Sequence, residues 1–146
     1  MKIRLVWVGK TRERFILEGL QKYLKLLQPY ADIDITEIRE EKTRDIGRML
    51  SREGERILSL RTSYVLLDEK GETLDSAAFA RFVEKQGSSI TFLLGGAYGV
   101  AEEVKARARK TIALSAMTFT HEMSRLIFLE QIYRAFTILQ KKGYHH

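Results

Sequence analysis

Short apolar segments typical of buried β-strands alternate along this chain with segments of helical periodicity. The apolar segments, which lack a regular polar alternation, are residues 3–8, 64–67, 90–94 and 111–114. Strands of this kind are usually buried on both faces, as in a parallel sheet covered by helices. The helical periodicity predicts helices over residues 11–27, 45–60, 75–86, 100–110 and 122–140. This order predicts an α/β fold with a mostly parallel sheet.

One further strand is expected to differ from the others. Ile33, Ile35 and Ile38 alternate with acidic residues, which is typical of a half-exposed strand near the edge of a sheet. The chain has 146 residues and no segment with the composition of a linker. We therefore expect a single domain that covers residues 1–146.

The last predicted helix is apolar around almost its whole circumference. Its apolar residues are Met123, Leu126, Ile127, Phe128, Leu129, Ile132, Tyr133, Ala135, Phe136, Ile138 and Leu139. One face can pack on the sheet, and a second copy of the chain is the simplest cover for another face. The sequence therefore predicts a homodimer, with complete burial inside one chain as the alternative.

Composition excludes several classes of protein. The chain has no cysteine, which excludes disulfides, thiolate catalysis and zinc–thiolate sites, and the spacing of its three histidines indicates no metal site. The apolar N-terminal stretch is too short for a signal peptide or a membrane span, so we expect a cytoplasmic protein. The net charge of +6 favours a polyanionic partner such as RNA, although many basic proteins bind none.

Two glycine-containing segments follow predicted strands. Gly9 with Lys10 and Thr11 lacks the earlier glycine of a phosphate-binding P-loop, so we interpret it as a strand-to-helix turn. Residues 95–99, Gly-Gly-Ala-Tyr-Gly, follow a buried strand and precede a helix. Glycines there allow the backbone to approach a ligand closely, but they also suit a tight turn without a ligand.

Residues 114–121 join the last strand to the final helix and carry small, hydroxyl and apolar side chains without charge. Such a loop can hold an adenosine ring. It can equally be a connector in which Thr120 caps the helix. The basic run from Lys105 to Lys110 fits either a solvated face or part of an RNA surface. Glu130 and Arg134 have the spacing of a helix-surface ion pair.

Several motifs in the same order and spacing resemble one family across nearly the whole chain. They are residues 1–3, 8–10, 53–58, 67–68 with Gly71, 94–96 with Gly99, 114–115, 117–119 with His121, 130–135, and 144–145. The family is the SPOUT-class ribosomal RNA large subunit methyltransferase H family, which modifies a pseudouridine of 23S ribosomal RNA. The resemblance implies a C-terminal deep trefoil knot, a homodimer, and S-adenosylmethionine as cofactor. The family usually has proline where this chain has Thr120, which affects the expected rigidity of that loop.

The resemblance also implies which residues form the site. The implied cofactor-binding residues are Leu67, Gly95, Gly96, Gly99, Leu114, Ser115, Ala116, Met117, Thr118 and Phe119. The implied reaction is methyl transfer to N3 of a pseudouridine, with Arg134, Tyr144 and His145 as candidates on the acceptor side, followed by His121. No metal is needed. We expect the substrate to be ribosomal RNA in an assembled particle that contacts both subunits.

Two rival functions remain open on the sequence. One is a SPOUT methyltransferase for another RNA, such as transfer RNA. The other is a ribosome-binding factor without catalytic activity. For the residues after Gly143, the alternative to a functional tail is a frayed chain end.

Overall fold

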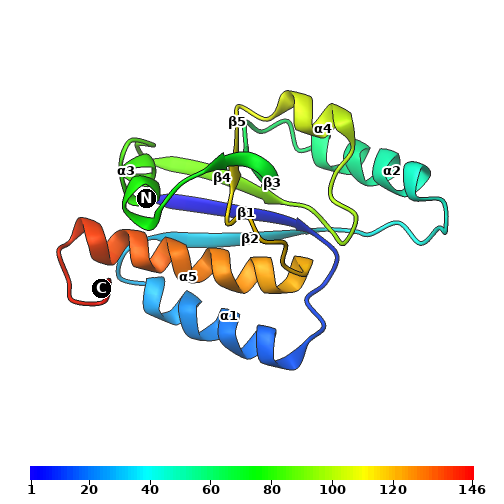
Figure 1. Cartoon of the computed structure of the whole chain (residues 1–146). Coiled ribbons are helices and arrows are strands. Elements are labelled where there is room, and N and C mark those ends of the chain that lie inside the picture. Colours follow the sequence, from blue (N-terminus) through cyan, green and yellow to red (C-terminus); the bar gives the residue numbers. More distant parts are fainter.

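The computed structural model describes residues 1–146 and consists of one five-stranded sheet covered by five helices (Figure 1). The strands are β1 (Lys2–Val8), β2 (Asp32–Ile38), β3 (Val65–Thr73), β4 (Ser89–Leu94) and β5 (Lys110–Ala113). The helices are α1 (Arg14–Leu27), α2 (Ile46–Leu58), α3 (Ser76–Glu84), α4 (Glu102–Arg107) and α5 (His121–Leu139). All neighbouring strands are parallel, in the order β2-β1-β4-β3-β5. The predicted α/β fold with a parallel sheet is confirmed.

Helices cover both faces of the sheet, as the apolar strands predict. Ile3, Leu5 and Trp7 of β1 pack in a core with α1, α3 and α5. Val6 and Val8 of the same strand pack in a second core with α2 and α4. Successive side chains of a strand point to opposite faces, so a strand buried on both sides needs apolar residues at both. The alternating strand β2 lies at one edge of the sheet, as expected.

Helix α5 lies between α1 and α3, and all of its 19 residues are buried or half-buried. Phe128, Leu129 and Ile132 face the core. The helix also lies very close to α1, where a Cβ on Gly19 would be 2.7 Å from Cδ1 of Leu126. Most of the apolar circumference of α5 is therefore covered within one chain. The apolar residues around α5 therefore do not by themselves require a second subunit.

Strand β3 is longer than the sequence predicts. Leu67 and Glu72 of β3 both pair with Ile112 of β5, and the residues between them cross close to that strand. A Cβ on Gly71 would lie 2.7 Å from the backbone nitrogen of Ile112. Residues 68–73 are mostly polar and carry no apolar strand signal, so only their contact with β5 makes this extension.

Helix α1 begins three residues later than predicted, because a side chain of α5 accepts hydrogen bonds from the backbone of the preceding turn. Gly9 adopts a φ of +83°, and its N–H donates to the carbonyl of Ile38 at 2.8 Å. The N–H groups of Arg12 and Glu13 both donate to Oε1 of Glu122 at 3.0 Å. The predicted strand-to-helix turn is confirmed. None of the five helices combines the length and hydropathy needed to cross a membrane.

Candidate functional site

A cavity of about 410 Å³ lies at the carboxyl ends of β4 and β5, beside the middle of β3. Its walls come from residues 66–70 within β3, from the residues that follow β4 and β5, and from the first turn of α5. The lining residues are Leu66, Leu67, Asp68, Glu69, Lys70, Leu94, Gly95, Gly96, Ala97, Tyr98, Gly99, Val100, Lys105, Leu114, Ser115, Met117, Thr118, Phe119, His121 and Ser124. Ligands of parallel α/β sheets usually bind at the carboxyl ends of the strands, so this is the candidate site.

The glycine segment after β4 forms a tight turn that is also a wall of the cavity. Gly99 has a φ of +80°, and its N–H donates to the carbonyl of Gly96 at 3.0 Å. A Cβ on Gly95 would lie 2.9 Å from the carbonyl carbon of Gly99. Both interpretations of this segment, a tight turn and a ligand-facing backbone, are therefore compatible with the geometry.

The loop between β5 and α5 lines the opposite part of the cavity and is fastened by its own hydroxyl groups. Ser115 Oγ accepts a hydrogen bond from the N–H of Met117 at 2.9 Å. Thr118 Oγ1 donates to Oε2 of Glu69 at 2.6 Å, which ties this loop to β3. Thr120 caps α5 by accepting from the N–H of Met123 at 3.2 Å. The loop is thus both a capped connector and a cavity wall.

Two large apolar side chains at the mouth of the cavity are exposed. Tyr98 is 60% exposed and Met117 is 75% exposed. Both belong to loops that line the cavity. They are suitably placed to cover a flat, partly apolar ligand such as a nucleoside.

Sequence reasoning missed all of the charged residues of the site. Asp68, Glu69 and Lys70 lie within β3, directly after its predicted apolar segment, and Lys105 reaches the cavity from α4. A usable signal was present, because polar residues directly after a buried parallel strand lie at its ligand-binding end. Of the cofactor-binding residues implied by the resemblance, only Ala116 does not line the cavity.

The first turn of α5 contributes two polar side chains to the cavity. His121 and Ser124 line the cavity. Burial, and then the positive charge of Arg125, lower the pKa of His121 below its usual value of 6.5. The imidazole is therefore neutral at pH 7 and can accept a hydrogen bond or a proton.

The buried Arg125 fastens α5 to the end of β1. Its Nη1 donates to the hydroxyl of Thr11 at 2.8 Å, and its Nη2 donates to the carbonyl of Val8 at 2.6 Å. The guanidinium lies over the Trp7 ring, 4.8 Å from its centroid. Burial is the main cause that lowers the pKa of Arg125. These contacts hold the helix turn that carries His121 against the sheet.

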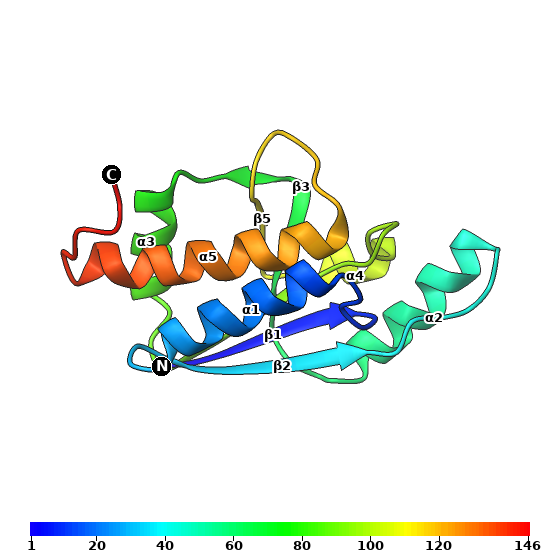
Figure 2. The same cartoon turned by 90° about the horizontal axis from the view of Figure 1, so that it is seen from below.

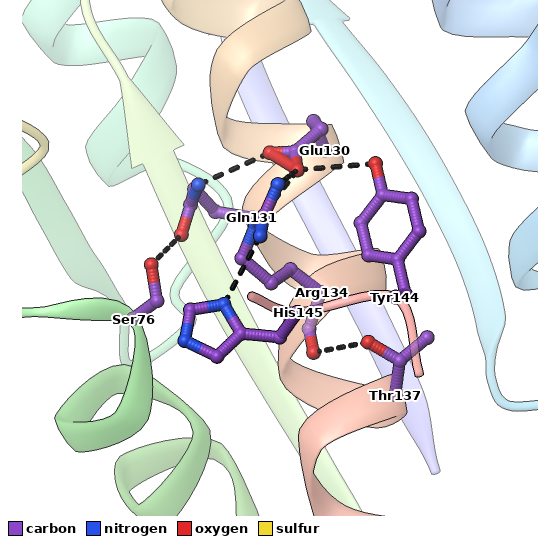
Figure 3. A network of polar contacts seen from close by, with 7 residues as sticks. All are labelled: Ser76, Glu130, Gln131, Arg134, Thr137, Tyr144 and His145. Atoms are coloured by element: carbon purple, nitrogen blue, oxygen red, sulfur yellow. Dashed lines mark hydrogen bonds and ion pairs between the residues drawn. The ribbon is translucent and has the colours of Figure 1, made fainter. Parts of the chain in front are cut away.

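The remaining predicted site residues form a separate cluster at the other end of α5 (Figure 3). Arg134 pairs with Glu130, its Nη2 lying 2.7 Å from Oε1. Its Nη1 lies 3.0 Å from Nδ1 of His145, and its guanidinium lies 4.9 Å from the centroid of the Tyr144 ring. The hydroxyl of Tyr144 donates to Oε1 of Glu130 at 3.2 Å. We call Glu130, Arg134, Tyr144 and His145 the tail cluster.

Two members of the tail cluster, Arg134 and Tyr144, are held in their protonated forms. The hydrogen bond to Glu130 raises the pKa of Arg134. Burial, followed by a hydrogen bond with Tyr23 and the negative charge of Glu130, raises the pKa of Tyr144. Tyr144 is therefore a protonated donor beside a permanent cation across the physiological pH range. The expected ion pair of Glu130 and Arg134 is confirmed.

The cavity and the tail cluster do not meet within one chain. Arg134 follows His121 by 13 residues, which corresponds to about 20 Å along a helix. Neither Arg134, Tyr144 nor His145 lines the cavity. Figure 2 shows the C-terminus beside α3, at the far end of α5 from its first turn. The structure therefore groups His121 with the cofactor-side residues and separates it from the other acceptor-side candidates.

A smaller cavity of about 280 Å³ lies between these two regions, bounded by α3, β5 and α5. It shares Leu114 and Phe119 with the larger cavity. Ser76 and Gln131 also line it, and Ser76 Oγ donates to Oε1 of Gln131 at 2.8 Å (Figure 3). Gln131 Nε2 in turn donates to Glu130 at 3.0 Å, which connects this cavity with the tail cluster. No group of three His, Asp or Glu side chains is arranged to hold a metal ion.

Comparison with known proteins gives consistent matches over the full length of the chain. A family model described as "Predicted SPOUT methyltransferase" matches residues 1–145. Proteins named "Ribosomal RNA large subunit methyltransferase H" from Trichlorobacter lovleyi and Geobacter sulfurreducens are each 46% identical to this chain. The corresponding protein of Geotalea daltonii is 44% identical. Each of the three matches covers the whole of both proteins.

Solved structures with little sequence identity share the fold. A probable methylase family protein from Haemophilus influenzae has a TM-score of 0.60 at 10% identity, covering 99% of this chain and 70% of its own. TrmJ from Z. mobilis has a TM-score of 0.54 at 12% identity, covering 92% of this chain and 70% of its own. At these identities the likeness concerns the fold alone.

Proposed function

This chain belongs to the SPOUT methyltransferase family, and we propose that it methylates N3 of a pseudouridine in the large-subunit (23S) ribosomal RNA, with S-adenosylmethionine as the methyl donor. Its relatives at 44–46% identity carry the name ribosomal RNA large subunit methyltransferase H. The observation that supports the proposal most strongly is the cavity at the ends of β4 and β5 and beside the middle of β3, which collects nine of the ten expected cofactor-binding residues. An enzyme for ribosomal RNA works where ribosomes are, so we expect it in the cytoplasm.

The residues of the cavity fit the chemistry of S-adenosylmethionine. Its volume of about 410 Å³ is within the range of small-ligand sites, about 300–1,000 Å³. Leu67, Leu114 and Met117 offer apolar contact for an adenine ring, and the carboxylates of Asp68 and Glu69 offer acceptors for hydroxyl or ammonium groups. A side chain at Gly95 would collide with the backbone of Gly99, so only a glycine keeps this wall open. S-adenosylmethionine supplies a methyl group bonded to a positively charged sulfur.

In this reaction the protein has to hold the acceptor nitrogen in line with the methyl group of S-adenosylmethionine. It also has to accept the proton that leaves this nitrogen. Alignment of two reactants in one geometry can supply most of the required acceleration. His121 is the group in the cavity that can take a proton, because burial and Arg125 keep its imidazole neutral. Pseudouridine N3 is weakly acidic, so we assign His121 an assisting role and positioning the larger one.

The separation of the tail cluster from the cavity supports a homodimeric enzyme. The half-buried residues Ser124, Ile127, Gln131 and Arg134 follow one another along one face of α5. This face begins at the larger cavity, continues along the smaller one and ends at the tail cluster. A twofold axis near its middle would bring the tail cluster of each subunit to the cavity of its partner. Arg134, Tyr144 and His145 would then hold the RNA acceptor opposite the partner's cofactor.

We further propose the trefoil knot of the family and an assembled ribosomal particle as substrate. The crossing of β3 over β5 at Gly71 is the kind of close strand contact that a threaded chain requires. One small domain offers little surface for reading a long RNA by sequence, so recognition should rely on the shape of the particle. The target base must also leave its stack to reach the cofactor.

Two measurements on the purified protein test the proposal. Calorimetry should detect binding of S-adenosylmethionine, and its absence would favour a ribosome-binding factor without catalytic activity. Methyl transfer from labelled S-adenosylmethionine should then be measured with large ribosomal subunits from a strain that lacks this enzyme, with free 23S RNA, and with transfer RNA. Methylation of the large subunit supports the proposal. Methylation of transfer RNA alone would assign the enzyme to another RNA.

A further inference from the structure

The N-terminal half of α2 projects beyond the sheet at the edge where the strands end (Figure 2). Residues 44–48 are all exposed, including Ile46, which is 44% exposed. The rest of α2 packs on α4 and on the core through Gly54 and Ile57. The helix is therefore anchored at one end, and its other end extends into solvent on the same edge of the sheet as the candidate cavity.

Five basic side chains cover this projection and the loop that leads to it. They are Arg39, Lys42, Arg44, Arg48 and Arg52, which we call the basic arm. All five are exposed, and none forms an ion pair within 4.0 Å. Arg48 and Arg52 are one helical turn apart, so they lie on the same face of α2.

The acidic residues of this region are mostly engaged elsewhere. Glu40 pairs with Arg12, and Glu41 pairs with Arg56 at 2.6 Å. Of the remaining acidic residues, Asp45 caps α2, Glu53 is buried, and Glu55 is exposed. Only Glu55 is exposed without a partner. Residues 39–56 hold six basic and five acidic side chains, so the arm presents five cations free of ion pairs on a segment whose net charge is +1.

The basic run in residues 105–110 differs from the arm. Lys105 pairs with Glu102, Arg107 with Glu103, and Lys110 with Glu72. Arg109 donates to the side chain of Gln86. The basic side chains of this run are paired with side chains of the same chain, which fits a solvated face. The other interpretation from the sequence was part of an RNA surface.

We propose that the basic arm binds the phosphate backbone of the RNA substrate. The proposal rests on the function proposed above, because the partner is the nucleic acid that the cavity serves. Guanidinium groups recognise phosphate oxygens with paired hydrogen bonds, and four of the five side chains are arginines. Residues 39–56 contain no aromatic residue that could stack on a base. The arm therefore contributes affinity and orientation, and reads no sequence.

The test replaces Arg48 and Arg52 with glutamine in one double variant, Arg48→Gln/Arg52→Gln. Glutamine keeps the helix propensity of arginine, so α2 should remain folded. The matched control is Arg81→Gln/Lys85→Gln. It removes two exposed basic groups without an ion pair at the end of α3, next to the start of β4 at the opposite edge of the sheet. For each variant, the kcat and KM of methyl transfer to large ribosomal subunits and the binding affinity for protein-free 23S RNA are measured over a range of salt concentrations.

The arm variant should show a KM about tenfold higher at low salt, with kcat and S-adenosylmethionine affinity close to those of the wild type. The slope of log affinity against log salt should become shallower by about 1.4–1.8, the value for two lost phosphate contacts. The control should match the wild type. An unchanged KM and salt slope in an active, folded arm variant would overturn the proposal. A higher KM with whole subunits but an unchanged affinity for protein-free RNA would also overturn it, because the contact would then be with a ribosomal protein. A wild-type protein that methylates no RNA would instead contradict the proposed function.

Discussion

Gly95 faces the backbone of Gly99 so closely that a Cβ on Gly95 would lie 2.9 Å from the Gly99 carbonyl carbon. Gly95→Ala should therefore displace the turn that lines the cavity and weaken binding of S-adenosylmethionine by about tenfold or more. Gly47→Ala is the control, because its Cβ would lie 3.5 Å from Oδ1 of Asp45, an ordinary contact, and Gly47 does not line the cavity. Calorimetry measures both affinities. Equal affinity in the two variants would place the cofactor away from this turn.

Arg125 should contribute strongly to stability. Arg125→Met removes the donors that satisfy the carbonyl of Val8 and the hydroxyl of Thr11, both beneath the first turn of α5. Leaving buried polar groups without partners costs about 1–3 kcal/mol each, so we expect the free energy of unfolding to fall by about 2–4 kcal/mol. The exposed pair of Arg4 and Asp34 provides the comparison, because Arg4→Met should cost less than about 1 kcal/mol. Urea unfolding would refute the assignment if the two variants lost equal stability.

His121 should make stability depend on pH. Burial and the charge of Arg125 lower its pKa in the folded state, so the unfolded chain binds a proton more readily than the folded chain. The contribution of His121 to the free energy of unfolding is therefore fully present above pH 6.5, the ordinary pKa of histidine. It is lost as the pH decreases through the lowered pKa of the folded state. His121→Gln should lose less stability than the wild type between pH 7.5 and the acidic range. Parallel pH profiles of the two proteins, measured by urea unfolding, would show that His121 is not responsible.

The tail should be required for methyl transfer and not for cofactor binding. Deleting residues 143–146 removes Tyr144 and His145, which lie far from the cavity of their own chain. We expect methylation of large subunits to fall by about 100-fold or more, with S-adenosylmethionine affinity within about twofold of the wild type. Sedimentation should still show a dimer. Full activity in the truncated enzyme would reduce the tail to a frayed end.

A mixed dimer tests whether the tail acts on its partner's cavity. Neither the truncated chain nor Gly95→Val should be active alone. In a mixed dimer, the intact cavity of the truncated subunit meets the intact tail of the Gly95→Val subunit. An equal mixture should recover on the order of a quarter of the wild-type activity, since half of the dimers are mixed and each has one complete site. No recovery in a mixture with proven subunit exchange would mean that each site belongs to one chain.

The sequence predicted most of the fold because two local signals pointed to the same architecture. The mostly apolar character of β1 and β4, without regular polar alternation, indicated strands buried on both faces, and the alternation of Ile33 and Ile35 with acidic residues indicated an edge strand. The extension of β3 could not be predicted, since its polar residues form a strand only by their contact with β5. The late start of α1 depends on Glu122, a residue more than a hundred positions away. Long-range contacts of this kind leave no periodic signal.

The expected cofactor-binding residues lie together in the structure, whereas most of the expected acceptor-side residues lie away from them. Residues carried over from the resemblance, such as Leu67 and Leu114, line one cavity, since the carboxyl ends of parallel strands lie together. Position along the chain could not show that Arg134 lies at the opposite end of α5 from that cavity. The apolar circumference of α5 was also ambiguous, because α1 and α3 cover most of it within one chain. Distances between sites are a property of the packed structure and not of sequence spacing.

Mass mapping of 23S ribosomal RNA tests whether this chain methylates a ribosomal pseudouridine. RNA is compared from a strain that lacks this enzyme, from the same strain with the wild-type chain restored, and from the strain with the tail deleted. We expect one pseudouridine that carries an added methyl group only when the wild-type chain is present. An identical methylation pattern in all three strains would contradict the proposed activity.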